Sequence, residues 1–195
     1  DILPDGSVKV IDYKSGSEKF SVKEAKAGWK LQLMLYLKAG LEYGRQHRQP
    51  AGVFYFLIEN PMIDMSKESR EDIGSSLESK IVNSFRLEGA IVNDPVVIES
   101  IAGKFDGRSS IVQLKTSPKG ISGSGNDRLF ERDEFMELLN DITDRVKETC
   151  EGIVSGDIKV APKQKDINMS ACTYCKYKNI CSFDIAFAGC KYEMI

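Results

Sequence analysis

The sequence predicts an α/β fold in which a mixed sheet is flanked by helices. Short stretches such as 52–58 are rich in β-branched and aromatic residues, which is the composition of buried strands. Two longer stretches, 21–44 and 131–154, repeat apolar residues at the spacing of one helix face. Because strand-like and helix-like stretches alternate along the chain, we expect the helices to pack against the sheet.

Length and composition limit the class of protein. The chain has 195 residues, of which 42% are hydrophobic and 29% charged, as in a globular domain with a substantial core. Its apolar runs are too short to span a bilayer. The net charge of −2 gives no overall basic field, so nucleic-acid binding would need a local basic surface or a partner. The chain begins at Asp1 without an initiator Met or signal peptide, and we expect residues 1–195 to be a single domain, an N-terminally truncated fragment of a larger protein.

The first fourteen residues predict a β-hairpin that turns at Asp5-Gly6. Its second strand ends in Asp12-Tyr13-Lys14, followed by a Ser-Gly turn. Because side chains alternate along a strand, Asp12 and Lys14 are expected on the same face. With this turn, the position opposite Asp12 falls ahead of Asp1.

Residues 21–44 predict one continuous helix. Ser21 to Glu24 fits a capping box, and apolar residues from Ala25 to Leu41 follow at helical spacing. Gln32 and Tyr36 are four positions apart, so both side chains are expected on one helix face.

The other elements follow in chain order. We expect a strand at 52–58, a mostly polar helix at 66–84, a strand at 90–92, a helical turn at 95–101, a strand at 111–114, a mobile loop at 115–127 and a helix at 131–154. The inward residues of the last helix are predicted to be Phe135, Leu138, Leu139, Ile142, Val146 and Ile153.

The pair of Asp12 and Lys14 indicates one kind of chemistry. A carboxylate beside an ammonium can hold a divalent metal ion and stabilise a developing negative charge, as hydrolysis of a phosphodiester requires. The alternative is a solvated ion pair on an edge strand.

Three cysteines near the C-terminus have the spacing of a metal centre. Cys172, Cys175 and Cys181 form a C-x2-C-x5-C run, which favours zinc or an iron–sulfur cluster over buried thiols. A fourth ligand is needed, and Cys150 and Cys190 are candidates, whereas His47 is expected to be a solvated loop residue. Five cysteines without a secretory signal argue against a disulfide framework and for a reducing, cytoplasmic compartment.

These motifs, in this order and spacing, resemble those of RecB-type PD-(D/E)XK nucleases, and most closely the C-terminal nuclease domains of the AddB/RexB helicase–nuclease subunits. The resemblance rests on 10–16, on Gln32 and Tyr36, on 52–56 and 156–158, and on 172–184. It implies a restriction-endonuclease-like core with a C-terminal Cys-rich segment. It also implies a Mg²⁺-dependent deoxyribonuclease, acting as an exonuclease in recombinational repair of DNA breaks, with DNA and an AddA-like helicase subunit as partners.

The resemblance assigns roles to individual residues. Asp12 and the backbone carbonyl of Tyr13 would bind the metal, and Lys14 would be the catalytic lysine. Gln32 and Tyr36 match the QxxxY motif that supports the active site. Cys172, Cys175 and Cys181 match three of four ligands of a 4Fe–4S cluster.

The sequence departs from the family pattern in two places. The family's first metal-binding Asp and first cluster cysteine both lie upstream of Asp1. Asp1 itself is expected diagonal to Asp12 on the same strand face, where it would replace the missing Asp poorly. We therefore expect feeble or no cleavage by this chain and incomplete iron binding.

Two alternative functions stay open, and one further set of residues bears on DNA. The alternatives are a CRISPR-associated RecB-like exonuclease and a non-catalytic, zinc-stapled DNA-binding scaffold module. The lysines that flank the cysteines could contact DNA phosphates in any of these proteins. They are Lys163, Lys165, Lys176 and Lys178.

Overall fold

The computed structural model describes residues 1–16, 18–43, 48–58, 73–123 and 128–195. The chain divides into two compact units, Asp1–Thr143 and Asp144–Ile195. The candidate catalytic residues all lie in the first unit. That both units belong to a single nuclease domain stays a prediction.

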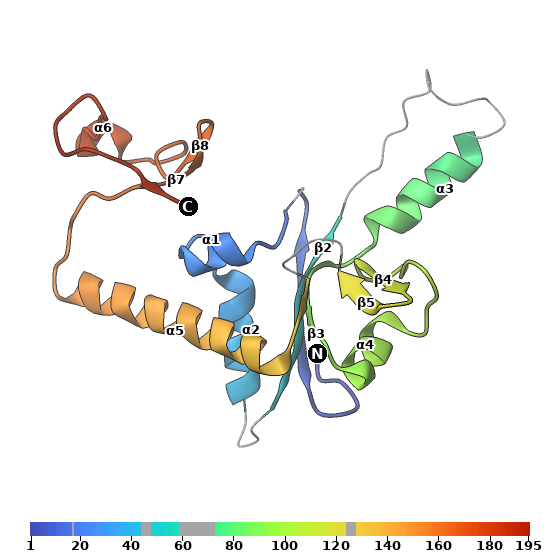
Figure 1. Ribbon diagram of the computed structural model, residues 1–195. Helices are drawn as coiled ribbons and strands as arrows, with labels where there is room; N and C mark the ends of the chain where they lie inside the picture. The colour runs from blue at the N-terminus through green and yellow to red at the C-terminus, as the bar shows by residue number, and fades with distance from the viewer. Residues whose placement is uncertain (17, 44–47, 59–72, 124–127) are drawn as a thin grey trace. The chain divides into compact units, whose positions relative to one another are not determined.

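The first unit is built on a four-stranded mixed sheet, as the sequence predicts (Figure 1). Its order is β1 (Val8–Lys14), β2 (Pro50–Leu57), β3 (Glu88–Val92) and β6 (Leu129–Phe130). β1 runs parallel to β2, β2 antiparallel to β3, and β3 parallel to β6. The predicted strands at 52–58 and 90–92 are therefore confirmed.

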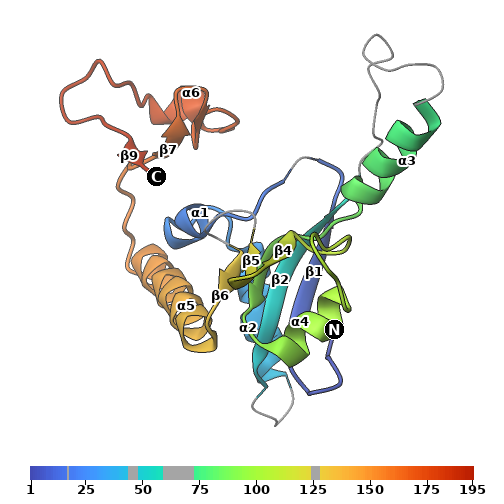
Figure 2. The ribbon, with the colours of Figure 1, turned by 45° about the vertical axis from the view of Figure 1, so that its right-hand side comes forward.

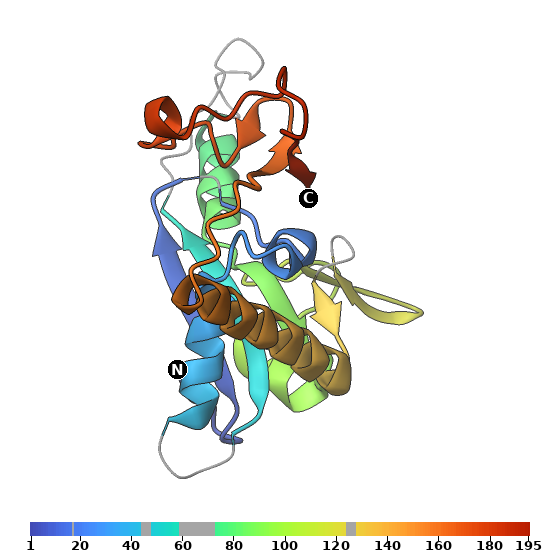
Figure 3. The same cartoon turned by 90° about the vertical axis from the view of Figure 1, so that its left-hand side faces the viewer.

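The two faces of this sheet bury separate apolar clusters. On one face, α2 (Gln32–Glu42) and the first turns of α5 (Arg132–Val154) pack against alternate residues of the strands (Figure 3). On the other face lies α4 (Pro95–Ala102), where the sequence predicts a helical turn (Figure 2). The first cluster includes Val8, Leu33, Met34, Leu37, Val53, Tyr55, Phe135 and Leu139, and the second includes Phe54, Ile91, Val97, Ile98 and Val112.

The N-terminal hairpin forms, but its register contradicts the expected position of Asp1. Asp1 pairs with Lys9 through backbone hydrogen bonds, and Ile2 bridges Val8. Paired residues share a face, and Lys9 is an odd number of positions from Asp12, so Asp1 lies on the opposite face from Asp12. Its carboxylate lies 3.8 Å from Lys9 Nζ. The expectation that Asp1 shares a face with Asp12 is wrong.

The continuous helix predicted for 21–44 is two helices. α1 (Val22–Lys26) begins at Ser21, whose hydroxyl accepts a hydrogen bond from the backbone N–H of Glu24. It ends because Gly28 adopts φ +79°, a left-handed conformation that a helix interior does not contain. α2 then begins at Gln32. The apolar spacing continues across the break, which is why periodicity alone does not reveal it.

Between β2 and α5 the structure differs from expectation at one segment. Residues 114–123 form a hairpin of β4 (Leu114–Ser117) and β5 (Gly120–Gly123), where the sequence suggested a strand ending at 114 and then a mobile loop. Gly120 at φ +108° allows the tight turn. α3 (Ile73–Ser84) lies within the predicted helix 66–84, of which 66–72 fall outside the described residues, as do 124–127 of the loop.

The second unit contains the end of α5 and a small three-stranded sheet. β7 (Lys163–Asp166) pairs antiparallel with β8 (Met169–Ser170) and parallel with β9 (Glu193–Met194), and α6 spans Lys178–Cys181. The predicted helix at 131–154 is confirmed, and Phe135, Leu138, Leu139 and Ile142 are buried as expected. Ile153 is exposed, so its prediction as an inward residue is wrong.

Among the helices in the described part of the chain, none combines the length and apolar character needed to cross a membrane.

Candidate active site

The end of β1 presents Asp12 and Lys14 on the same face of the sheet. Val8 and Val10 on this face pack into the cluster beneath α2, and the alternation carries Asp12 and Lys14 to the polar end of the same face. Lys14 Nζ lies 2.9 Å from Asp12 Oδ2. The predicted neighbourhood of these two groups is therefore present. The intervening Tyr13 side chain points to the other face, where its ring lies 5.4 Å from that of Phe56.

The first turns of α2 bring the predicted Gln32 and Tyr36 to this pair. Lys14 Nζ donates a hydrogen bond to Gln32 Oε1 at 2.8 Å. The Gln32 amide Nε2 in turn donates to the Tyr36 hydroxyl at 3.0 Å. The four side chains form one connected polar chain that links a strand end to a helix face. The sequence predicted the members of this chain, and the structure adds the contact between them.

The electrostatics of the pair keep Lys14 charged. The contact with the Asp12 carboxylate raises the pKa of Lys14 above its ordinary value, against the opposing effect of burial. Asp12 is 17% exposed, and its buried Oδ2 accepts no hydrogen bond in the described part of the chain beyond its contact with Lys14. An anionic oxygen with so few partners is a natural ligand for a cation.

A cavity of about 450 Å³ opens beside this chain. Tyr55 belongs to its wall because it pairs with Asp12 across the parallel strands β1 and β2. Burial raises the pKa of Tyr55, while Lys30 and Lys14 oppose this shift. The residues that line the cavity are Lys14, Glu18, Trp29, Lys30, Leu31, Gln32 and Tyr55.

Sequence reasoning did not identify Glu18, Lys30 and Tyr55 as site residues. Glu24, interpreted from the sequence only as part of the capping box, also contributes, because its carboxylate lies 3.3 Å from Lys30 Nζ. The break at Gly28 brings α1 and its carboxylate back beside the start of α2. Its one signal in the sequence is that glycine, inside an otherwise helical pattern.

The donor atoms at β1 fit a partly hydrated magnesium ion. In the described residues, no three His, Cys, Asp or Glu side chains gather as a metal-binding group. Mg²⁺, however, is commonly held by one or two carboxylates together with water and substrate phosphates. The buried Asp12 Oδ2 meets that requirement, and the Tyr13 carbonyl follows it directly in the chain.

The cysteine run does not form a closed metal centre. All five cysteines are free; Cys172 and Cys190 are half-buried, whereas Cys150, Cys175 and Cys181 are exposed. The described chain, which contains every cysteine, brings no three of them into a metal-binding group. As they stand, these thiols do not fit a zinc ion or an iron–sulfur cluster. His47, expected to be a solvated loop residue, lies outside the described residues.

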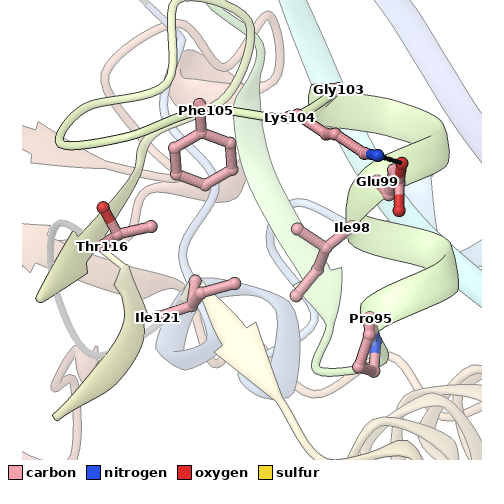
Figure 4. A pocket seen from close by; sticks show the side chains of 8 residues that line it. All are labelled: Pro95, Ile98, Glu99, Gly103, Lys104, Phe105, Thr116 and Ile121. Atoms are coloured by element: carbon pink, nitrogen blue, oxygen red, sulfur yellow. Dashed lines mark ion pairs between the residues drawn. The ribbon is translucent and has the colours of Figure 1, made fainter. Parts of the chain in front are cut away.

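A second cavity, of about 240 Å³, lies between α4 and the β4–β5 hairpin (Figure 4). Ile98, Phe105 and Ile121 give it an apolar wall, and an ion pair between Lys104 and Glu99 lies at its edge. It has none of the predicted site residues and is distinct from the cavity beside Lys14.

A family model described as the PD-(D/E)XK nuclease superfamily matches residues 1–182, which include the strand, the helix and the cysteine run. The chain belongs to the PD-(D/E)XK nuclease superfamily. Membership explains why a carboxylate and a lysine two positions apart end a strand of a mixed sheet. It also agrees with the α/β class expected from the sequence.

Several curated PD-(D/E)XK relatives are named as one of the subunits of an ATP-dependent helicase/deoxyribonuclease. That of Alkaliphilus oremlandii is 34% identical over 202 residues, covering 100% of this chain and 17% of the relative. That of Alkaliphilus metalliredigens is 33% identical and that of Thermoanaerobacter sp. (strain X514) 29%, each over 96% of this chain and 16% of the relative. The chain therefore spans about a sixth of the length of these relatives.

Proposed function

We propose that this chain is the metal-dependent deoxyribonuclease domain of a helicase–nuclease subunit, with Asp12, Lys14, Gln32 and Tyr36 as its active-site residues. The observation that carries the proposal is the position of Lys14, whose ammonium contacts both the Asp12 carboxylate and the Gln32 amide. A charged group fixed by two partners is poised to act on an anionic substrate.

Each residue has a distinct role in the proposed reaction. Lys14 stabilises the negative charge that develops on the scissile phosphate and orients the attacking water. Gln32 holds the Lys14 ammonium in place, and Tyr36 fixes the orientation of the Gln32 amide. Asp12 and the Tyr13 carbonyl would hold Mg²⁺, which supplies an activated water and neutralises phosphate charge when bound.

The proposed substrate is DNA, and the proposed setting is the processing of double-strand breaks for recombinational repair. The support comes from the relatives, whose names describe a subunit of an ATP-dependent helicase/deoxyribonuclease. We propose a helicase subunit of the AddA type as partner. The five free cysteines support a reducing compartment, which we propose to be the cytoplasm.

Metal binding and cleavage test this function together. Binding of Mn²⁺, used as a spectroscopic probe for Mg²⁺, is measured by electron paramagnetic resonance for the chain and for Asp12→Asn. Asp5→Asn, at the hairpin turn, is the matched control. We expect a site that Asp12→Asn loses and Asp5→Asn keeps.

Cleavage of linear DNA with Mg²⁺ is measured in the same variants and in Lys14→Ala. We expect slow degradation at high enzyme concentration that Asp12→Asn and Lys14→Ala abolish. Absence of an Asp12-dependent metal site together with absence of Lys14-dependent cleavage would overturn the proposal. Rapid cleavage would instead show that the upstream carboxylate of the family pattern is dispensable, and the two-carboxylate mechanism would be wrong.

We also propose that Cys172, Cys175 and Cys181 ligate a 4Fe–4S cluster in the intact protein. Their spacing supports this proposal, whereas their open arrangement requires that cluster binding draw the segment together. Iron and sulfide analysis after anaerobic reconstitution tests it, with zinc measured in parallel. Substoichiometric iron that falls further in Cys175→Ser is expected; zinc alone would contradict the cluster.

A further inference from the structure

Lys30 lies in the same cavity as Lys14 but has no role in the reaction described above. Its Nζ lies 2.7 Å from Glu18 Oε2 and 3.3 Å from Glu24 Oε2. It also donates to the Lys19 carbonyl oxygen at 3.3 Å. One ammonium thus faces two carboxylates at the wall of a site that the proposed function fills with DNA.

The two carboxylates differ in their exposure to solvent. Glu24, on α1, is 7% exposed, so its pairing with Lys30 is part of the packed structure. Glu18, on the segment that joins β1 to α1, is 43% exposed. Ion pairs with an exposed partner contribute little and exchange readily. Glu18 can therefore leave Lys30 at small cost, whereas Glu24 cannot.

The buried partner also keeps Lys30 charged. Burial works to lower the pKa of Lys30, but Glu18 and Glu24 outweigh it, and the pKa lies above its ordinary value. The Lys30 side chain remains 24% exposed and, together with Lys14 and Gln32, lines the 450 Å³ cavity. Two ammonium groups on one cavity suit an anion with more than one charged group, such as a nucleic-acid backbone.

We propose that Lys30 binds a DNA phosphate next to the one at Lys14, with Glu24 as its fixed support and Glu18 as a carboxylate that the phosphate displaces. This inference rests on the proposed function, because it deepens the same site. Glu18 occupies the phosphate position in the free protein and is released when DNA binds.

The test measures DNA binding rather than cleavage. Fluorescence anisotropy of a labelled single-stranded oligonucleotide, in EDTA and over a range of salt concentrations, is compared among the chain, Lys30→Gln, Lys30→Arg and Glu18→Gln. Lys38 and Glu42 provide matched controls, because they form an ion pair at 3.2 Å within α2 and lie outside the cavity lining. Thermal unfolding of each variant checks its fold.

The expected effects have opposite signs. Lys30→Gln weakens binding about tenfold and reduces the slope of log affinity against log salt by about 0.7, the value for one phosphate contact to a single strand. Lys30→Arg retains most of the affinity. Glu18→Gln tightens binding by about threefold, as expected for removal of a weak competing ion pair. That gain disappears in the double variant with Lys30→Gln. Lys38→Gln and Glu42→Gln leave affinity within about twofold.

A purely structural role for Lys30 predicts different results. Glu18→Gln would then leave DNA affinity unchanged or match Glu42→Gln, and either result overturns the inference even where Lys30→Gln fails to fold. Wild-type binding with an unchanged affinity in Lys30→Gln also overturns it, and leaves the nuclease proposal intact. Failure of the wild-type chain to bind DNA, with no Asp12-dependent metal site, overturns both.

Discussion

The ammonium of Lys14 donates a hydrogen bond to Gln32 Oε1 across 2.8 Å, although the two residues are 18 positions apart. This contact joins the end of β1 to the first turn of α2. It fixes the Lys14 amine against a helix that is itself anchored in the apolar cluster beneath it. A substitution at Gln32 therefore tests whether the position of the amine matters for cleavage.

Gln32→Ala is expected to reduce the single-turnover rate of DNA cleavage by about tenfold or more, because Lys14 loses one of its two fixed partners. Tyr36→Phe removes only the hydroxyl that accepts from Gln32 and should have a smaller effect. Quenched-flow or gel assays with saturating enzyme measure both rates. Equal rates for Gln32→Ala and wild type would show that the hydrogen bond has no catalytic role.

The pKa of Lys14 should depend on Asp12. In Asp12→Asn the carboxylate that raises it is gone, so the pKa should fall toward the ordinary value of 10.5. A group with a raised pKa stabilises the fold fully below its unfolded pKa, and this contribution disappears as pH rises through the folded pKa. Titration of ¹³C-labelled lysine side chains by NMR gives the value, with Lys38 as reference. An unchanged pKa in Asp12→Asn would contradict the ion pair.

Asp94 should make the stability of the fold depend on acid pH. Burial works to raise the Asp94 pKa, but Arg132 and the N–H groups of Val97 and Val96 lower it overall, below 3.8. Asp94 caps α4, so Asp94→Ala should cost about 1–2 kcal/mol at pH 7.

A lowered pKa gives stability that is present above the unfolded pKa and lost as pH falls through the folded pKa. The cost of Asp94→Ala should therefore shrink below about pH 4. Urea unfolding at several pH values measures it. Asp94→Asn, which retains an oxygen acceptor for the cap, should lose only the ion-pair share. A cost that is independent of pH would rule out the charge as its source.

Two glycines should respond in opposite ways to alanine. A Cβ at Gly89 would lie 1.9 Å from the Val53 carbonyl oxygen, so Gly89→Ala should destabilise the sheet by about 2–4 kcal/mol. Gly74, in α3, has no atom within 4 Å of such a Cβ, and Gly74→Ala should stabilise by about 0.5–1 kcal/mol. Calorimetry compares the two. A similar change in both variants would contradict the close approach of β2 and β3.

The local pattern of the sequence was sufficient to predict the members of the candidate site. Alternation along 8–14 places Asp12 and Lys14 on one face, and a four-residue spacing places Gln32 beside Tyr36. The same reasoning predicted β2, β3, α4 and α5, because their apolar patterns are strong. It failed at Gly28 and at 114–123, where a left-handed glycine decides the path of the backbone without changing the apolar pattern.

The sequence by itself determined which side chains of the site share a face of a strand or a helix, since that depends only on the repeat of the backbone. Tertiary structure alone decided that α2 covers the polar end of β1, that Tyr55 joins Asp12, and that Glu18, Glu24 and Lys30 meet beside Lys14. These contacts join segments whose pairing is set by burial of the two apolar clusters. Burial is a property of the packed chain and leaves no spacing in the sequence to read.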